Sequence, residues 1–144
     1  MKVSEILRSK GNKVMTVRPT ESIIVLARRL KLERVGAMIV SADGKIIDGI
    51  ISERDVAYGV AEYGDRLQNL PVSELMTKSV ITCSLDDTVA EISRIMTQRR
   101  VRHIPVCEKG RLIGVVSVGD VVKQRLDEME MEANILRDYA IALQ

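Results

Sequence analysis

The stretch Gly114-Val115-Val116-Ser117-Val118-Gly119-Asp120 decides the fold, because the chain contains the same pattern a second time. Its counterpart is Gly49-Ile50-Ile51-Ser52-Glu53-Arg54-Asp55, and the serines and aspartates of the two copies lie 65 positions apart. In each copy a glycine precedes two aliphatic residues, which is typical of a short buried strand. The Ser-x-x-Asp that follows is typical of a helix start, with serine as N-cap and the acid as third residue. The pattern therefore predicts a strand that runs directly into a helix, twice.

Such a junction has two interpretations. The unpaired N–H groups and the positive dipole end of the helix favour a phosphate group. The Ser117 hydroxyl could also contact phosphate, and the Asp120 carboxylate suits the paired hydroxyls of a ribose. Alternatively, Ser-x-x-Asp is an ordinary capping box, worth about 1 kcal/mol to the helix and implying no ligand. Repetition indicates a structural unit used twice and leaves both interpretations open.

The repeat extends over most of the chain. The corresponding segments are Thr16–Ile23 and Thr82–Val89, Arg34–Val40 and Arg100–Val106, the turns Asp43-Gly44 and Lys109-Gly110, and the lead-in segments Val3–Leu7 and Val72–Met76. Apolar residues three and four apart after each first strand predict an amphipathic helix. The expected fold class is therefore α/β (α+β), with two tandem β-α-β-β-α repeats. Each repeat is too small for a core of its own, so we expect the two to pack about a pseudo-twofold axis.

These boundaries predict a first repeat with its lead-in segment at 1–68, a second repeat at 69–125 and a C-terminal helical extension at 126–144. Apolar residues recur along this helix in alternating steps of four and three, at Val122, Leu126, Met129, Ala133, Leu136, Ala140 and Leu143. The stripe needs cover, either along its own domain or against a second subunit in a coiled coil. A homodimer is the expected assembly.

Composition narrows the class of protein. Of 144 residues 46% are apolar and 29% charged, the balance of a globular domain. The net charge of +2 gives no argument for nucleic acid, and the scarcity of aromatic residues speaks against a base-stacking platform. No apolar run approaches the ~20 residues of a membrane span. Cys83 and Cys107 lie in apolar runs without metal-ligand spacing, which favours buried thiols in a reducing cytoplasm.

The sequence favours no enzyme class. It contains no phosphate-binding Walker loop, no GxGxxG and no nucleophile–base pair, and His103 is the only histidine. We therefore expect no catalytic residue and no metal site.

The duplicated unit resembles a cystathionine-β-synthase (CBS) domain pair, or Bateman module. Three features carry the resemblance: the two Gly-aliphatic-aliphatic-Ser-x-x-Asp motifs, their common register, and Ile104-Pro105-Val106 on the middle strand of the second copy. It covers the chain from about Val3 to Gln124. The resemblance implies a non-catalytic sensor or regulator that binds AMP, ADP or ATP between the two repeats. The alternatives are an NAD(H)- or S-adenosylmethionine-binding module and a ligand-free dimerisation scaffold.

The resemblance also implies two nucleotide sites, in which aspartate binds the ribose and serine a phosphate. One site would use Ser117, Asp120, Arg102 and His103 with Thr16, Val17, Gly36 and Ala37. The other would use Ser52, Asp55 and Arg54 with Ile81 and Thr82. Gly36-Ala37 is small and neutral where Arg102-His103 is large and basic, which suits a flat base plus a phosphate. We therefore expect the Asp120 site to be the better occupied.

Overall fold

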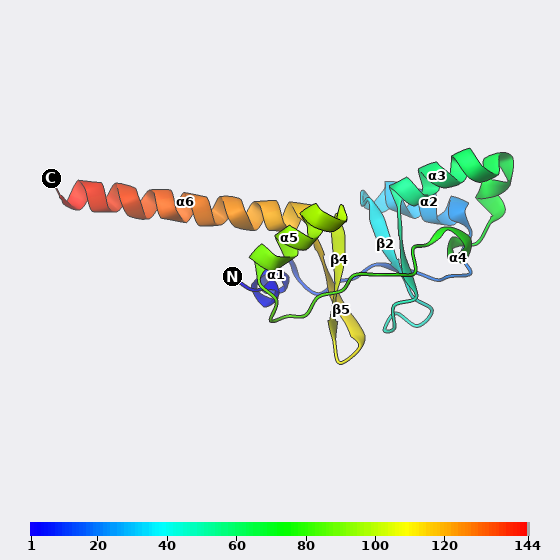
Figure 1. Ribbon diagram of the computed structural model, residues 1–144, viewed down its shortest axis with the longest axis horizontal. Coiled ribbons are helices and arrows are strands. Elements are labelled where there is room, and N and C mark those ends of the chain that lie inside the picture. Colours follow the sequence, from blue (N-terminus) through cyan, green and yellow to red (C-terminus); the bar gives the residue numbers. More distant parts are fainter. Residues whose placement is uncertain (144) are drawn as a thin grey trace.

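The computed structural model describes residues 1–143 and contains the predicted repeat (Figure 1). Its elements are α1 (Val3–Lys10), β1 (Thr16–Val17), α2 (Ile23–Glu33), β2 (Ala37–Val40), β3 (Gly49–Ser52), α3 (Glu53–Tyr63), the 3₁₀ helix η1 (Gly64–Asn69), α4 (Val72–Leu75), α5 (Val89–Arg99), β4 (His103–Glu108), β5 (Arg111–Ser117) and α6 (Val118–Ala142). The order β1-α2-β2-β3-α3 recurs as α5-β4-β5-α6, so the mixed α/β class is confirmed.

The first strand of the second repeat is shorter than predicted. β1, β2 and β3 form a three-stranded sheet, whereas β4 and β5 form a two-stranded one. In place of a third strand, Cys83 makes a single parallel bridge to Val106. The N–H of Cys83 donates to the carbonyl of Pro105 at 2.9 Å, and the N–H of Cys107 donates to the carbonyl of Cys83 at 2.9 Å. The segment around Cys83 is therefore still hydrogen-bonded to β4, although it does not form a regular third strand.

Matching helix ends show how closely the repeats correspond. Ser22 caps α2 by accepting a hydrogen bond from Val25 N–H, and Thr88 caps α5 in the same way. At the other end, Arg34 and Arg100 both adopt the left-handed conformation, with φ of 56° and 54°. A left-handed C-cap ends a helix by satisfying its last carbonyls. Both helices therefore begin with the same type of N-cap and end with the same type of C-cap.

The two strand connections differ. Lys109 and Gly110 both have positive φ and join β4 to β5 in a tight turn, as predicted. Between β2 and β3 the connection is longer, and Asp43-Gly44 lies inside residues 41–48. The Asp43 carboxylate accepts hydrogen bonds there from the N–H groups of Lys45 and Ile46. β2 and β3 form the antiparallel pair that a turn at Asp43-Gly44 predicts, and this side chain stabilises a loop that is wider than the tight turn of the second repeat.

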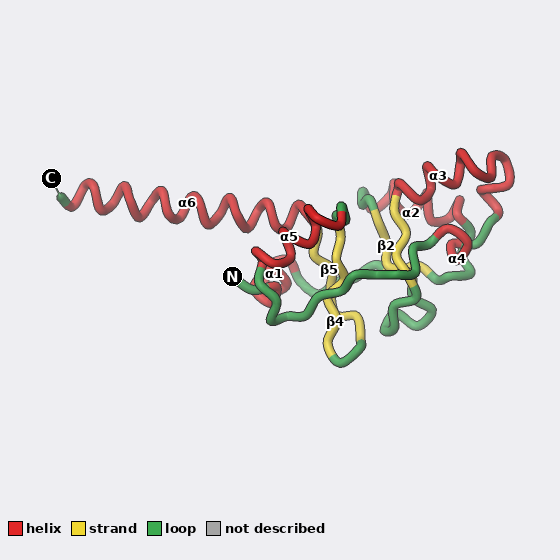
Figure 2. Tube along the Cα trace, in the orientation of Figure 1, coloured by secondary structure: helices red, strands yellow, loops and turns green. Residues whose placement is uncertain are grey.

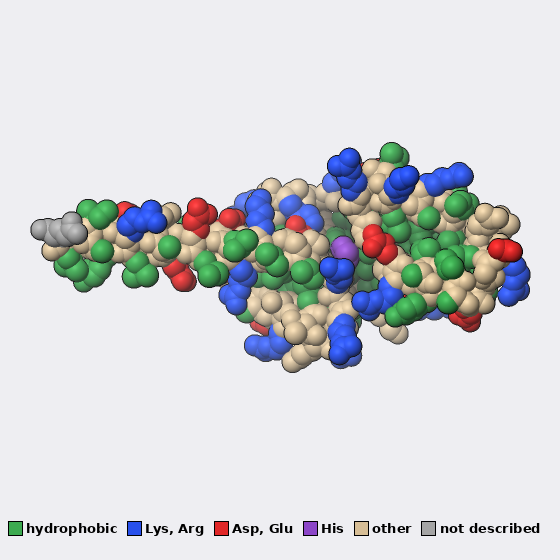
Figure 3. All heavy atoms as spheres, turned by 90° about the horizontal axis from the view of Figure 1, so that it is seen from above, with side chains coloured by type: hydrophobic (Ala, Val, Ile, Leu, Met, Phe, Trp, Pro, Cys, Tyr) green, Lys and Arg blue, Asp and Glu red, His purple; other side chains and the backbone are tan. Residues whose placement is uncertain are grey.

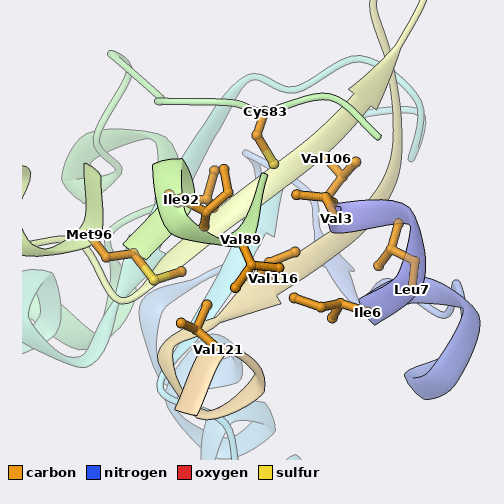
Figure 4. Packing of buried hydrophobic residues seen from close by; sticks show 11 residues of the cluster. Val3, Ile6, Leu7, Cys83, Val89, Ile92, Met96, Val106, Val116 and Val121 are labelled. Carbon is orange, nitrogen blue, oxygen red and sulfur yellow. The ribbon is translucent and has the colours of Figure 1, made fainter. Parts of the chain in front are cut away.

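Each lead-in segment packs on the opposite half of the molecule. Val3, Ile6 and Leu7 of α1 lie in one core cluster with Val89 and Val116 of the second repeat (Figure 4). Conversely, α4 packs on the first repeat, and Figure 2 shows the long loop that leads from it across to α5. The halves are thereby joined by exchanged helices.

The glycines that open the two motifs make room for this exchange. A Cβ on Gly114 would lie 2.8 Å from Cδ1 of Leu7, and a Cβ on Gly49 would lie 2.8 Å from Sδ of Met76. Leu7 and Met76 hold equivalent places in their lead-in segments. The close approach of helix to strand therefore explains glycine at both positions.

Helix α6 extends far beyond the body of the molecule (Figure 1). Val121 is its only buried residue among those described. The first turns of α6 pack on the second repeat, but the outer part of the helix does not lie along its own domain, which was one of the two predicted arrangements. The predicted extension 126–144 is the outer part of this continuous helix, except that Gln144 lies outside the described residues. Across residues 1–143, none of the helices is both long enough and apolar enough to pass through a membrane.

Candidate functional site

Both Ser-x-x-Asp stretches form complete capping boxes. The N–H of Ser117 donates to Asp120 Oδ2 at 2.8 Å, and the N–H of Asp120 donates to Ser117 Oγ at 3.2 Å. The corresponding distances for Ser52 and Asp55 are 2.8 and 3.4 Å. The predicted helix starts are therefore confirmed. A ligand site at either junction requires further groups around it.

The junction at Ser117 has such groups, because a cleft of about 310 Å³ lies beside it between the two repeats. Four residues of the predicted nucleotide site line this cleft: Gly36, Ala37, His103 and Ser117. The remaining lining residues are Lys10, Lys13, Val14, Met15, Arg34, Val35, Met38, Ile39, Ile50 and Val115. Figure 3 shows the histidine side chain in the hollow where the two halves meet, with basic side chains nearby. The lining therefore combines apolar side chains with three cationic ones.

Lys10 is the residue of this site that sequence reasoning missed. Its Nζ lies 2.7 Å from Asp120 Oδ2 and donates a second hydrogen bond to the carbonyl of Val115 at 2.9 Å. Lys10 reaches Asp120 because α1 packs on the second repeat. Lys13 and Arg34 were missed as lining residues as well. No signal in the sequence pattern marks these residues, because the repeat does not show that α1 packs on the second half of the molecule.

The charge of Asp120 is set by opposing effects. Burial by itself raises the pKa of this carboxyl, but the hydrogen bonds from Lys10 and from the Ser117 N–H lower it, and the net pKa lies below the usual value. Among the described residues, only Oδ2 of the two carboxylate oxygens accepts hydrogen bonds. Asp120 is therefore an anion at neutral pH whose Oδ1 remains available to a ligand.

His103 is neutral in this setting. Burial lowers its pKa below 6.5, the charges of Arg102 and Lys10 lower it further, and Asp120 and Glu53 only partly oppose them. A Cβ on Gly36 would lie 3.7 Å from Glu53 Oε1 and 3.8 Å from His103 Cε1, so acid and imidazole flank the glycine. At neutral pH the histidine therefore offers a hydrogen-bonding group, and the cleft's positive charge comes from Lys10, Lys13 and Arg34.

Four residues predicted for the site do not line the cleft, and Asp120 is one of them. Asp120 is connected to the cleft through its hydrogen bond from Lys10, which does line it. Thr16 and Val17 form β1 and pair with β2, and Val17 is fully buried in the core. The preceding residues Val14 and Met15 line the cleft instead. Arg102 has an exposed side chain, and its carbonyl accepts a hydrogen bond from the N–H of Val118 at 2.9 Å.

The second predicted site is not brought together in the same way. Ser52, Asp55 and Ile81 are half-buried, while Arg54 and Thr82 are exposed. The cleft described above contains none of these five residues, and neither does a second cavity of about 380 Å³ between α2, α3 and η1. Within residues 1–143, no three His, Cys, Asp or Glu side chains converge on a point where a metal ion could bind.

The chain matches the family model of the CBS domain twice, over residues 3–62 and 72–127. It is 29% identical over 145 residues to "CBS domain-containing protein CBSX3, mitochondrial" of Arabidopsis thaliana, with 95% of this chain and 70% of that protein covered.

Two solved structures extend the likeness to three dimensions. The CBS-domain containing protein ATU1752 from Agrobacterium tumefaciens superposes with a TM-score of 0.83 at 43% identity, over 87% of this chain and 99% of that one. The CBS domain pair of protein MJ0100, in complex with 5′-methylthioadenosine and S-adenosyl-L-methionine, gives a TM-score of 0.75 at 23% identity. That alignment covers 86% of this chain and 98% of the other, and at this identity it shows a shared fold.

Proposed function

The chain belongs to the CBS-domain family as a pair of CBS repeats, and on this premise we propose that it binds an adenine nucleotide (AMP, ADP or ATP) in the cleft beside Ser117. CBS pairs are regulatory modules. The proposed role is that of a non-catalytic sensor, in which the nucleotide shifts the module between conformations of different affinity.

The single observation that carries this proposal is the composition of the cleft walls. Lys10, Lys13 and Arg34 bring positive charge to the cleft that Ser117, the N-cap of α6, also lines, which favours a phosphate group. The Ser117 hydroxyl lies at the same place and can donate to a phosphate oxygen. The lining also includes Gly36 and Ala37, together with apolar residues that can contact a flat base. One cleft thus offers the two surfaces that a nucleotide needs.

Asp120 supplies the third contact, to the ribose. Its carboxylate is charged, held in place by two hydrogen bonds to Oδ2, and has Oδ1 available among the described residues. A carboxylate with one oxygen fixed is a preorganised acceptor for sugar hydroxyls. Lys10 holds this carboxylate before the ligand arrives.

The Asp120 site is proposed to be the better occupied of the two. At the 66-residue spacing that relates Thr16 to Thr82, the counterpart of Lys13 is Ser79. The junction at Ser52 and Asp55 therefore has a serine at the position equivalent to Lys13, and it lines neither of the two cavities described above. Because phosphate binding depends on charge, affinity at the second junction is expected to be lower.

Isothermal titration calorimetry with AMP, ADP and ATP tests the proposal. Asp120→Ala is expected to weaken binding at least ~10-fold, since a hydrogen bond to a charged group is worth about 1.5–3 kcal/mol. The matched variant Asp55→Ala removes the same group from the other repeat and is expected to retain the affinity. Absence of heat and of thermal shift with all three nucleotides would reject the proposal, and Asp120→Ala with full affinity would reject the site.

Two alternatives are included in the same titration. The MJ0100 pair was solved with S-adenosyl-L-methionine and 5′-methylthioadenosine, which favours testing both together with NADH. Binding of one of these, and of no adenine nucleotide, would identify an S-adenosylmethionine- or NAD(H)-binding module instead. The complete capping boxes favour a ligand-free dimerisation scaffold, which predicts no binding by any of the compounds.

We further propose a homodimer and a reducing compartment, the cytoplasm. The exposed stripe of α6 supports the dimer, whose mass light scattering would measure. Two cysteines that form no disulfide within the described residues support the compartment, although the Arabidopsis relative is mitochondrial. Imaging of the tagged protein in its host tests this assignment. The non-catalytic role predicts that ATP incubated with the protein is recovered intact, and that nucleic acid and membrane vesicles do not bind it.

A further inference from the structure

The outer part of α6 presents an apolar stripe that no other part of the described chain covers. Its heptad core positions are Leu126, Ala133 and Ala140 at a, and Val122, Met129, Leu136 and Leu143 at d. The large side chains of this set are between 50% and 70% exposed. From Val122 to Leu143 the stripe runs about 32 Å, at ~1.5 Å per residue. An apolar seam of this length and period is suited to a second helix with the same period.

We propose that this seam pairs with the same seam of a second copy of the chain, as a parallel, in-register coiled coil. The inference rests on the proposed homodimer and adds its surface and its orientation. It is independent of the ligand, because the seam begins beyond the cleft residues.

The charges that border the seam carry the argument for orientation. The g positions are Arg125 and Glu132, and the e positions that follow them are Glu130 and Arg137. In a parallel coiled coil each g residue faces the e residue five positions later on the other helix. Arg125 then faces Glu130 of the second copy, and Glu132 faces Arg137 of the second copy. Both pairs are attractive, and twofold symmetry makes each of them twice.

An antiparallel pair over the same length is less complementary. In that arrangement e positions face e positions and g positions face g positions. The register that overlaps the whole seam places Leu126 against Leu143 of the second copy. It brings Glu130 to Arg137, but it brings Glu132 to Tyr139 and leaves Arg125 beyond the end of the other helix. Only the parallel register gives every one of these four charges an opposite partner.

The pair of Glu132 and Arg137 is the cleaner one to test. Arg125 already lies 3.7 Å from Glu128 of its own helix, whereas residues 1–143 contain no ion pair with Glu132 or Arg137. Both side chains belong to the exposed part of α6. A change at either one therefore alters the seam without disturbing a contact within the protomer.

Charge reversal tests the pairing. Glu132→Arg places two arginines together at each of two symmetric contacts, and the dimer dissociation constant measured by sedimentation equilibrium is expected to rise ~10-fold. Adding Arg137→Glu to the same chain restores opposite charges and is expected to restore the dissociation constant. In the antiparallel register the double variant would instead bring Glu130 of one chain against the glutamate introduced by Arg137→Glu in the other, and the dissociation constant would stay high. Asp138→Arg, on the outer face of the same helix, is the matched control and is expected to change nothing.

Cross-linking distinguishes directly between a parallel and an antiparallel pair of α6 helices. Leu143→Cys places a thiol near the helix tip, where a parallel dimer brings both tips together and an antiparallel one separates them by ~26 Å. We expect rapid formation of a disulfide-linked dimer under mild oxidation, and none from the unmodified chain. A monomer at all concentrations would overturn the homodimer itself. If the chain is a dimer but the Leu143→Cys variant forms no cross-link, the parallel seam is overturned. The same holds if Glu132→Arg leaves the dimer dissociation constant unchanged. Neither result would affect the calorimetric binding of nucleotide, which tests the proposed function separately.

Discussion

Removing the Lys10 ammonium is expected to destabilise the protein by about 1 kcal/mol. The Nζ–Oδ2 distance to Asp120 is 2.7 Å, and the two side chains are 35% and 21% exposed. Exposed ion pairs are worth about 0.2–1 kcal/mol and buried charge-assisted hydrogen bonds about 1.5–3 kcal/mol. This pair is intermediate in exposure, and Lys10 is also fixed by its hydrogen bond to Val115. A coupling near 1 kcal/mol follows, equivalent to about 2–4 °C in Tm.

A double-mutant cycle measures this coupling. Lys10→Met, Asp120→Asn and the combination are compared by urea denaturation at pH 7 and low salt. Lys13→Met is the matched control, because Lys13 lines the same cleft but is in no ion pair within the described residues. A coupling below ~0.3 kcal/mol, or an equal loss from Lys13→Met, would refute the reasoning, since the ion pair would then be no more than a surface contact.

The cycle also has a defined pH dependence. The folded-state pKa of Asp120 is below 3.8, so the carboxylate contributes stability that is fully present above the unfolded value. This contribution is lost as the pH falls through the folded pKa. The coupling between Lys10 and Asp120 is therefore expected to hold at pH 5 and 7 and to vanish in strong acid. A coupling that persists after the carboxylate protonates would show that charge is not its source.

Three further outcomes are expected. Because the folded pKa of His103 lies below 6.5, wild-type stability falls on acidification just below pH 6.5, where the unfolded chain protonates first, and urea titrations of His103→Gln should lack this slope. Gly114→Ala forces a methyl group to 2.8 Å from Leu7 and should cost about 1–3 kcal/mol by denaturation. Its control Gly119→Ala, 3.6 Å from the nearest atom in its surroundings, should cost nothing or stabilise α6. Burial and the charge of Asp87 raise the pKa of Cys83 to about 12, so a thiol reagent at pH 8 should label it only after unfolding.

Much of the fold could be predicted because its signals are local. Serine or threonine before an apolar stripe marks a helix start, and both Ser22 and Thr88 cap their helices as expected. The two Ser-x-x-Asp motifs were sufficient to place the strand-to-helix junctions. The turn at Asp43-Gly44 was predicted but the width of its loop was not, because an Asp-Gly pair is compatible with a tight turn and with a wider one. Side-chain hydrogen bonds from Asp43, invisible in a residue pattern, decide between them.

The site was predictable only in part, because its groups come from distant parts of the chain. Ser117 belongs to the second motif, Gly36, Ala37 and His103 lie at the start of the strands that pair with the motifs, and all four line the cleft. Lys10 reaches Asp120 across 110 positions, through a lead-in helix that packs on the other repeat. A repeat pattern shows that two segments are equivalent, but it does not reveal which half each one packs against. The sequence analysis therefore assigned the positive charge of the cleft to Arg102 and His103, which lie in the same repeat as Ser117 and Asp120.

Helix α6 begins at the cleft, with Ser117 as its N-cap, and ends far outside the body of the molecule. From Asp120 to Leu143 its axis measures about 35 Å, so tilting its base by roughly 5° sweeps the tip through ~3 Å. A displacement at the base of α6 that is too small to alter the core is thus enlarged at the tip of the helix. Spin labels at the tip of α6 and on the body of the same protomer would test, as a change in their separation, whether nucleotide in the cleft moves the helix.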